Sequence, residues 1–128
     1  MNYSRLRQKL LAMDKQRRDL LRQVLRPSAM ISGSLFQMHR RCGNPRCKCA
    51  RGELHSSWYL SRPKEGKTKL TYIGKIVPEW LSTRVRRYQR YQKTLAEIRK
   101  IDAEISRGLN RLRDEKVQGF EQAERGRL

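Results

Sequence analysis

Apolar residues recur at steps of three and four positions near the start of the chain. The stripe consists of Leu6, Leu10, Met13, Leu20 and Val24. Arg17 occupies the one charged position within this stripe, whose spacing is typical of a helix that packs against another helix. Ser4 can cap the start of the helix, and Pro27 disfavours the helical conformation at Arg26. The pattern therefore predicts a helix over residues 4–26.

A second and longer helical pattern begins near Pro78. Its stripe consists of Leu81, Val85, Tyr88, Tyr91, Leu95, Ile98, Ile101, Ile105, Leu109 and Leu112. Proline suits the first helical position and Glu79 suits the first turn, so the pattern predicts a helix over residues 78–116. Gly108 is a weak point at which this helix can kink or end. The polar residues 117–128 predict a frayed tail.

Between these helices the pattern changes to an alternation of period two. Residues 58–62 and 67–73 each predict a strand, and residues 63–66 predict the turn of a β-hairpin. A short apolar segment at residues 35–38 predicts a further strand that leads into the cysteines. An isolated hairpin is marginally stable in water, so we expect this one to need support from a metal and from the helices.

The three cysteines of the chain lie in one short segment. Together with a histidine they follow the pattern C-x4-C-x-C-x5-H, formed by Cys42, Cys47, Cys49 and His55. Three thiolates and one imidazole are a ligand set of tetrahedral structural zinc sites, so we predict a structural zinc ion here. His39 is the alternative fourth ligand. The alternative interpretation of the cysteines is metal-free thiols or a local disulfide.

These elements predict an α+β fold that is mostly helical. The two helices form a long antiparallel helical hairpin of coiled-coil type, and a zinc knuckle with the β-hairpin, residues 34–76, is inserted between them. A length of 128 residues predicts a single domain over residues 1–128. Because the first helix is the shorter, we expect residues 101–112 to be uncovered, which predicts a homodimer through the seam of the long helix.

Charge gives the clearest indication of function. The chain has 31 basic and 12 acidic residues, with a formal net charge of +19. Binding a polyanion relieves the repulsion, and nucleic acid is the leading candidate. A membrane surface is the weaker candidate, because no strongly apolar helix face is paired with a lysine face. The absence of a signal peptide and of an apolar run of about 20 residues predicts a cytoplasmic protein.

The residues predicted to contact nucleic acid are basic and cluster around the cysteines, the hairpin and the start of the long helix. They are Arg40, Arg41, Arg46, Lys48, Arg51, Arg62, Lys64, Lys67, Lys69, Arg84, Arg86, Arg87, Arg90 and Lys93. Trp58, Tyr59 and Tyr72 are predicted to stack on bases, since aromatic and basic side chains together bind nucleic-acid strands. The alternative interpretation is that the aromatic residues pack against the helices and that the basic residues are only solvated.

The motif Cys42-Gly43-x3-Cys47-x-Cys49-x2-Gly52-x2-His55, followed by Trp58-Tyr59-Leu60-Ser61, carries a resemblance. Over residues 33–105 the chain resembles a small bacterial and archaeal family of unknown function. That family tends to have Gly-Pro where this chain has Ser56-Ser57, so we expect a different entry into the following strand. The resemblance implies a zinc-type knuckle and an association with transposons or other mobile elements, and it favours DNA over RNA as the partner. It implies no established activity.

The sequence does not predict an enzyme. It contains no serine–histidine–acid set, no phosphate-binding loop and no pair of carboxylates beside the metal ligands, and four protein ligands close a zinc ion to substrate. We therefore predict a zinc-stabilised nucleic-acid-binding accessory protein with no small-molecule substrate. The alternative is a helical protein-interaction or scaffolding module. Salt distinguishes the two, because phosphate binding weakens steeply with ionic strength.

Overall fold

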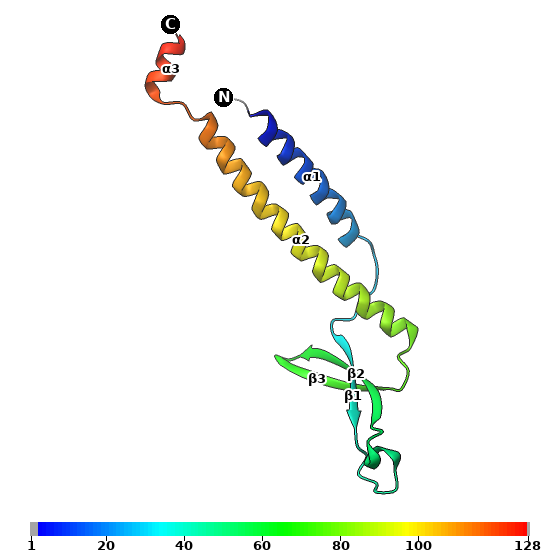
Figure 1. Cartoon of the computed structure of the whole chain (residues 1–128). Helices are drawn as coiled ribbons and strands as arrows, with labels where there is room; N and C mark the ends of the chain where they lie inside the picture. Colours follow the sequence, from blue (N-terminus) through cyan, green and yellow to red (C-terminus); the bar gives the residue numbers. More distant parts are fainter. Residues whose placement is uncertain (1–2, 128) are drawn as a thin grey trace. The chain divides into compact units, whose positions relative to one another are not determined.

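The computed structural model describes residues 3–127 and contains helices and one antiparallel sheet (Figure 1). The elements in order are α1 (Ser4–Val24), β1 (Ser34–Arg40), the 3-10 helix η1 (Lys48–Arg51), β2 (His55–Lys64), β3 (Lys67–Gly74), α2 (Glu79–Lys116) and α3 (Phe120–Arg127). The α+β class expected from the sequence is confirmed. Over these residues, no helix is both long and apolar enough to cross a membrane.

The chain divides into two compact units. Unit 1 joins the N-terminal segment up to Arg26 to the segment from Lys93 onward, and unit 2 is Pro27–Gln92. Helix α2 therefore supplies its first residues to unit 2 and its later residues to unit 1. The single domain predicted from the sequence stays a prediction, and each unit is described by itself.

Unit 1 is held together by the apolar stripes of α1 and of the later part of α2. Its buried residues Leu10, Met13 and Ile101 pack with Leu6, Leu20, Ile105 and Leu112. The Tyr3 hydroxyl donates to the backbone oxygen of Glu115 at 3.1 Å, as expected for antiparallel helices. Helix α1 thus covers Ile101, Ile105 and Leu112, and the expectation that this stretch is uncovered is wrong for them, whereas Leu109 is 52% exposed. The homodimer stays a prediction without that reason for it.

Two helix-end predictions for unit 1 are also wrong. The N-cap residue of α1 is Tyr3, which makes no side-chain cap hydrogen bond, so Ser4 is the first helical residue and not the cap. Residues Phe120–Arg127 form α3 where the sequence predicts a frayed tail. An acidic residue in its first turn and arginines in its last turn interact favourably with the helix dipole and so stabilise the helix.

Gly108 lies inside α2 and neither kinks nor ends it. A Cβ atom built at this position would lie 2.5 Å from Cδ2 of Leu10. The glycine therefore allows α1 and α2 to approach closely, and this use outweighs its low helix propensity. An early end of α2 at Gly108 is therefore not found, since the helix continues to Lys116.

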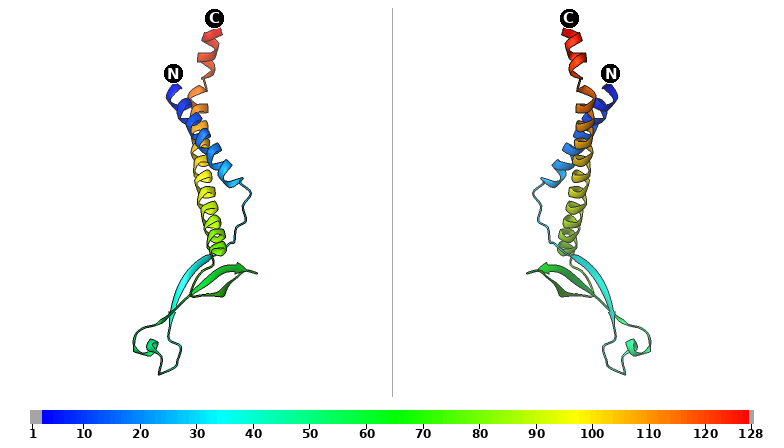
Figure 2. Two further views of the ribbon diagram at one scale, coloured as in Figure 1. Left: turned by 90° about the vertical axis from the view of Figure 1, so that its right-hand side faces the viewer. Right: turned by 90° about the vertical axis from the view of Figure 1, so that its left-hand side faces the viewer.

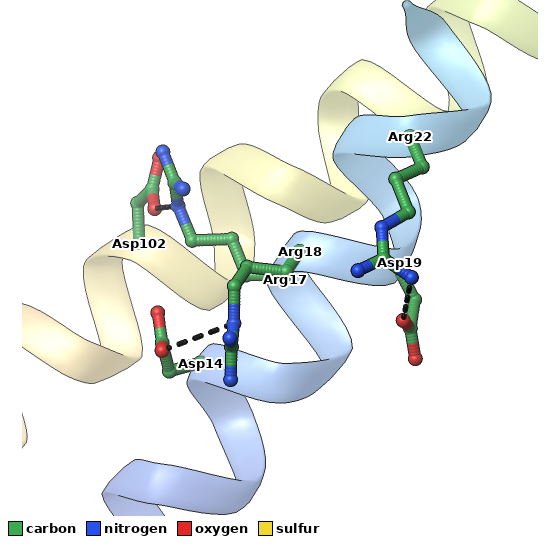
Figure 3. Close-up of polar contacts among 6 residues, drawn as sticks. All are labelled: Asp14, Arg17, Arg18, Asp19, Arg22 and Asp102. Carbon is green, nitrogen blue, oxygen red and sulfur yellow. Dashed lines mark hydrogen bonds and ion pairs between the residues drawn. The ribbon is translucent and has the colours of Figure 1, made fainter.

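The charged position in the stripe of α1 has a partner on the other helix. The Arg17 guanidinium donates a hydrogen bond to the Asp102 carboxylate, and both side chains are partly buried (Figure 3). Along α1, Arg18 pairs with Asp14 at 3.4 Å and Arg22 pairs with Asp19 at 3.9 Å (Figure 3). A charge at the helix seam is tolerated here because an opposite charge meets it.

Unit 2 contains a three-stranded antiparallel sheet in the order β1-β2-β3 (Figures 1 and 2). The apolar segment at residues 35–38 belongs to β1, which pairs along its whole length with β2. The predicted hairpin is thus part of a larger sheet. Pro63 lies within β2, but beyond the last pairing to β1 at Ser61, so its missing N–H breaks no bond to that strand.

One face of this sheet packs on the start of α2. The buried residues are Leu60 from β2 and Leu81 and Val85 from α2, with exposed fractions of 6%, 4% and 2%. The partly buried residues packed against them are Ile31, Leu35, Ile73 and Val77. The core of unit 2 is small, which agrees with the low apolar content of the chain.

Candidate metal centre and nucleic-acid interface

Cys42, Cys47, Cys49 and His55 lie close together and can hold a metal ion. Their ligand atoms all lie within 4.8 Å of one another. The sulfur atoms of Cys42 and Cys49 are 3.4 Å apart, and Cys47 Sγ lies 3.1 Å from His55 Nε2. Tetrahedral zinc with bonds of about 2.3 Å to sulfur and about 2.0 Å to nitrogen places its ligands about 3.5–3.8 Å apart. The donor set is one that zinc uses, and its atoms are close enough to hold one metal ion.

The cysteines are free thiols and not a local disulfide. A disulfide joins two sulfur atoms that are about 2.05 Å apart. The closest sulfur pair here, Cys42 and Cys49, is 3.4 Å apart. The disulfide interpretation is therefore wrong for this structure, and the thiols remain available as ligands.

The loop reaches this arrangement through short-range hydrogen bonds (Figure 2 shows it beyond the ends of β1 and β2). The Asn44 side-chain oxygen accepts from the Arg46 N–H at 3.0 Å, and the Asn44 carbonyl accepts from the Cys47 N–H at 3.0 Å. Gly43, with a φ of 82°, lies just before this turn, and Gly52, with a φ of 112°, follows η1. Both glycines adopt left-handed conformations. These turns bring cysteines that are near in sequence onto one point.

The register of β1 and β2 decides between the two histidines. Arg40 pairs with His55, and His39 pairs with Ser56. Because neighbouring residues of a strand lie on opposite faces, His39 and His55 lie on opposite faces of the sheet. Among residues 3–127, the group near the cysteines contains His55 and not His39.

The cysteines of the group differ in burial and in pKa. Cys49 is 1% exposed, whereas Cys42 is exposed. The Asn44 backbone N–H and the neighbouring thiols lower the pKa of Cys42. The Cys42 N–H, 3.2 Å from the Cys49 sulfur, acts to lower the pKa of Cys49, but loss of hydration and the adjacent thiols outweigh it and raise that pKa. Cys42 is therefore the more readily deprotonated of the two.

The predicted phosphate contacts lie on the surface of unit 2, with two exceptions. The exposed ones are Arg40, Arg41, Arg46, Lys48, Arg51, Lys64, Lys67, Lys69, Arg84, Arg86, Arg87 and Arg90. Lys93 is exposed but belongs to unit 1. Arg62 is half-buried, and its Nε atom is buried with no hydrogen-bond partner in the described part of the chain. Arg62 is therefore the least accessible of the predicted set.

Two of the α2 arginines also make contacts within unit 2. The Arg84 guanidinium lies 5.5 Å from the centre of the Trp80 ring, and the Arg87 guanidinium donates to the Ala29 carbonyl at 3.4 Å. Arg86 and Arg90 lie one helical turn apart and are exposed. Arg86 and Arg90 are therefore the arginines of α2 best placed to contact a partner.

The charged residues of unit 2 form no ion pair with any residue between positions 3 and 127. Residues 27–92 contain 14 basic residues and 3 acidic residues. All ion pairs found among residues 3–127 lie in unit 1, and none involves residues 27–92. The positive surface around the cysteines, the sheet and the start of α2 is thus uncompensated, a feature that an anionic partner would relieve.

The predicted aromatic set is divided by the sheet. Tyr59 contacts Tyr72 edge-to-face with ring centres 5.5 Å apart, and it stacks on Phe36 at 6.0 Å. Trp58 precedes Tyr59 in β2, so strand alternation places it on the opposite face. Trp58 thus lies on a different face from Tyr59 and Tyr72, Phe36 lies beside Tyr59, and base stacking by the predicted set stays a prediction. Finding Phe36 requires the register between β1 and β2, which no local pattern specifies.

The family described as DUF6788, a domain of unknown function, matches residues 10–83, more than half of the chain. The matched segment contains the metal group and the whole sheet. No curated protein and no solved structure matches the chain.

Proposed function

We propose that this chain, which belongs to the DUF6788 family, is a nucleic-acid-binding protein whose basic surface is shaped by a structural zinc site. DNA is the favoured partner. The observation that carries the proposal is the uncompensated charge of unit 2, with 14 basic residues against 3 acidic ones and no internal ion pair within the described residues. Nucleic acid supplies a dense row of negative charge that such a surface can neutralise.

The metal site has a structural role in this proposal. Cys42, Cys47, Cys49 and His55 would hold the ion, and four protein ligands leave no open position for a substrate. Cys49 is 1% exposed although it belongs to a short loop outside the apolar core, so the bound ion would replace the missing core there. A bound zinc ion would close this loop and fix the exposed Arg46, Lys48 and Arg51 around it.

The test compares two pairs of arginines with equal charge. In the first variant, Arg86→Ala and Arg90→Ala remove exposed charges of α2 that lack partners in the described chain. In the matched control, Arg18→Ala and Arg22→Ala remove charges that pair with Asp14 and Asp19 in unit 1. Fluorescence anisotropy with a labelled DNA duplex measures the affinity of each protein after circular dichroism has shown that both are folded.

We expect the variant at residues 86 and 90 to bind about tenfold more weakly and the control to bind nearly as the natural protein does. The reason is that phosphate contacts with unpaired cations contribute to affinity, whereas the control cations are already partly neutralised. Equal losses in both variants would mean that net charge alone attracts DNA and would contradict a binding surface on unit 2.

A second candidate function is a helical protein-interaction module. It is supported by exposed leucines in unit 1, namely Leu11, Leu25 and Leu109 at 60%, 69% and 52%. Binding through such residues is nearly insensitive to salt, whereas phosphate binding is not.

The association with mobile elements implied by the sequence resemblance is also part of the DNA-binding proposal, and it names the setting in which DNA binding would act.

A further inference from the structure

The outer face of the sheet carries a row of three aromatic rings, one from each strand. Phe36 pairs with Tyr59 across β1 and β2, and Tyr59 pairs with Tyr72 across β2 and β3. The rings touch in sequence, stacked at 6.0 Å and edge-to-face at 5.5 Å. The Arg40 guanidinium lies over the Tyr59 ring, 5.4 Å from its centre. The row is thus continuous and has a cation at its side.

This aromatic row does not belong to the core of unit 2. The buried cluster of Leu60, Leu81 and Val85 lies on the opposite face of the sheet. On the aromatic face, Tyr72 is 62% exposed and its strand neighbour Leu70 is 51% exposed. Of the three rings, Tyr72 is therefore open to solvent, whereas Phe36 and Tyr59 are half-buried.

A pocket continues the aromatic row toward the metal group. It has a volume of about 290 Å³ and is lined by Met38, Arg40, Arg41, Cys42, His55, Ser57 and Tyr59. Arg40 and Arg41 bring two exposed positive charges to its rim. None of the three acidic residues of unit 2 lines it. Aromatic rings that can stack on bases and arginines that can bind phosphate therefore lie next to each other on this face.

We propose that this face binds unpaired nucleobases, with a base stacked on Tyr72 and a backbone phosphate of the same strand held by Arg40 and Arg41. The partner is a single-stranded segment of nucleic acid. Charge complementarity favours it over an apolar protein segment, which would gain nothing from the arginines. Bases inside a duplex have both faces covered by their neighbours, so only unpaired bases can use the rings.

This inference deepens the proposed function and rests on it. The arginines of α2 can contact the phosphates of either a duplex or a single strand, whereas the aromatic face adds affinity for single strands alone. Aromatic–base stacking contributes about 1–3 kcal/mol per base when measured by substitution, which corresponds to about 5-fold to 150-fold in affinity. The affinity gained from stacking depends much less on salt concentration than the affinity gained from the phosphate contacts.

The experiment measures anisotropy of labelled oligothymidine of about 12 nucleotides, a length within the site sizes of single-strand binding folds. The oligonucleotide is titrated with the full-length protein loaded with zinc and, separately, with the variants Tyr72→Leu, Tyr72→Phe and Trp80→Leu. Trp80 is the matched control, because it is 57% exposed and aromatic but lies on α2 away from the sheet face. An abasic oligonucleotide of equal length and a duplex of the same length complete the set.

We expect Tyr72→Leu to weaken oligothymidine binding about fivefold or more, while Tyr72→Phe and Trp80→Leu retain it. Duplex affinity stays unchanged in all variants, and the natural protein binds the abasic strand as weakly as Tyr72→Leu binds oligothymidine. Unchanged oligothymidine binding by Tyr72→Leu, with weaker binding by the Arg86 and Arg90 variant, would overturn the inference and leave the proposed function standing. No binding to any oligonucleotide would overturn both.

Discussion

Units 1 and 2 are both positively charged, but they handle that charge in different ways. Unit 2 has 14 basic residues against 3 acidic ones, and the rest of the chain has 17 against 9. In unit 1 the carboxylates are used, since Asp14, Asp19 and Asp102 each pair with an arginine. In unit 2 no ion pair forms among the described residues. The comparison shows that the two units differ in how their charges are paired as well as in how many they carry.

The two units also differ in what stabilises them. Unit 1 buries a helix–helix seam around Leu10, Met13 and Ile101. Unit 2 has a small core beneath one face of its sheet, and the loop of residues 42–54 lies outside that core except for the buried Cys49. Apolar packing between helices is present in unit 1, whereas the core of unit 2 is small, and we propose that a metal ion bound by the Cys–His group adds to its stability.

Metal removal provides the largest expected effect on this difference. Structural zinc contributes about 10–16 kcal/mol of apparent binding free energy in zinc-finger peptides, far more than a small core supplies. We therefore expect a chelator, or Cys49→Ser, to abolish the dispersed amide signals of unit 2 in NMR spectra while the helical circular dichroism of unit 1 persists. Retention of the unit 2 signals without metal would show that the sheet and loop fold on their own.

Replacing each histidine separately sharpens the metal assignment. His55→Ala removes a ligand atom from the group, whereas His39→Ala changes a residue on the other face of the sheet. We expect His55→Ala to weaken zinc affinity by more than the roughly tenfold to hundredfold loss caused by outer-sphere changes, and His39→Ala to leave it unchanged. Competition with a chromogenic zinc chelator measures both, and a loss in the His39 variant would reverse the assignment.

Gly33 tests the backbone of unit 2 independently of the metal. Its φ is 152°, and a Cβ atom there would lie 2.6 Å from the Ser61 carbonyl oxygen. Gly74 has a φ of 129° but no atom near the position of a Cβ. We expect both alanine variants to lose about 1–3 kcal/mol of stability from strain, and Gly33→Ala to lose more because of the clash. Urea unfolding followed by the fluorescence of Trp58 and Trp80, both in unit 2, measures the difference, and equal losses would exclude the clash.

Gly108 gives the corresponding test in unit 1, with a smaller expected effect. Gly108→Ala gains about 1 kcal/mol of helix propensity but forces the new methyl group against Leu10, and overpacking costs about 1–3 kcal/mol. We expect a net loss of about 1 kcal/mol in urea unfolding monitored by circular dichroism. In the Leu10→Ala background the same change becomes stabilising. A stabilising Gly108→Ala in the natural chain would show that the helices have room to move apart.

The Arg17–Asp102 pair is expected to have the smallest effect. Both side chains are more than a third exposed, at 35% and 47%, so solvent screens the attraction. We expect Asp102→Asn to cost about 0.5–1 kcal/mol and the cost to fall in high salt. Asp14→Asn is the control within one helix and costs less. A cost that does not change with salt would mean that packing, not charge, is lost.

The sequence is sufficient for those features that depend on local spacing. The heptad-like stripes predict both helices. The Cys–His spacing predicts the four residues that lie together, because residues so near one another in a short loop are also close in space. Zinc, nucleic-acid binding and dimerisation stay predictions. The mixed α+β class also follows from local patterns, since periods of 3.6 and 2 are distinct.

The features that depend on register could not be predicted from the sequence. The pairing of Phe36 with Tyr59 follows from how β1 aligns with β2, and that of Tyr59 with Tyr72 from how β2 aligns with β3. The packing of α1 on residues 101–112 depends on how α1 is aligned along α2. The close approach of Gly108 and Leu10 is part of that alignment. Long-range alignment depends on packing between distant segments, which leaves no periodic signal in either one.

The most direct test of a nucleic-acid surface on unit 2 is the salt dependence of DNA binding. A labelled duplex is titrated with the zinc-loaded protein by fluorescence anisotropy over a series of salt concentrations. We predict a linear fall of log K with log salt, with a slope of about −0.9 for each phosphate neutralised and several phosphates in total. The slope becomes shallower in the Arg86→Ala and Arg90→Ala variant. Absence of binding at low salt, or an affinity that does not change with salt, would contradict the proposal.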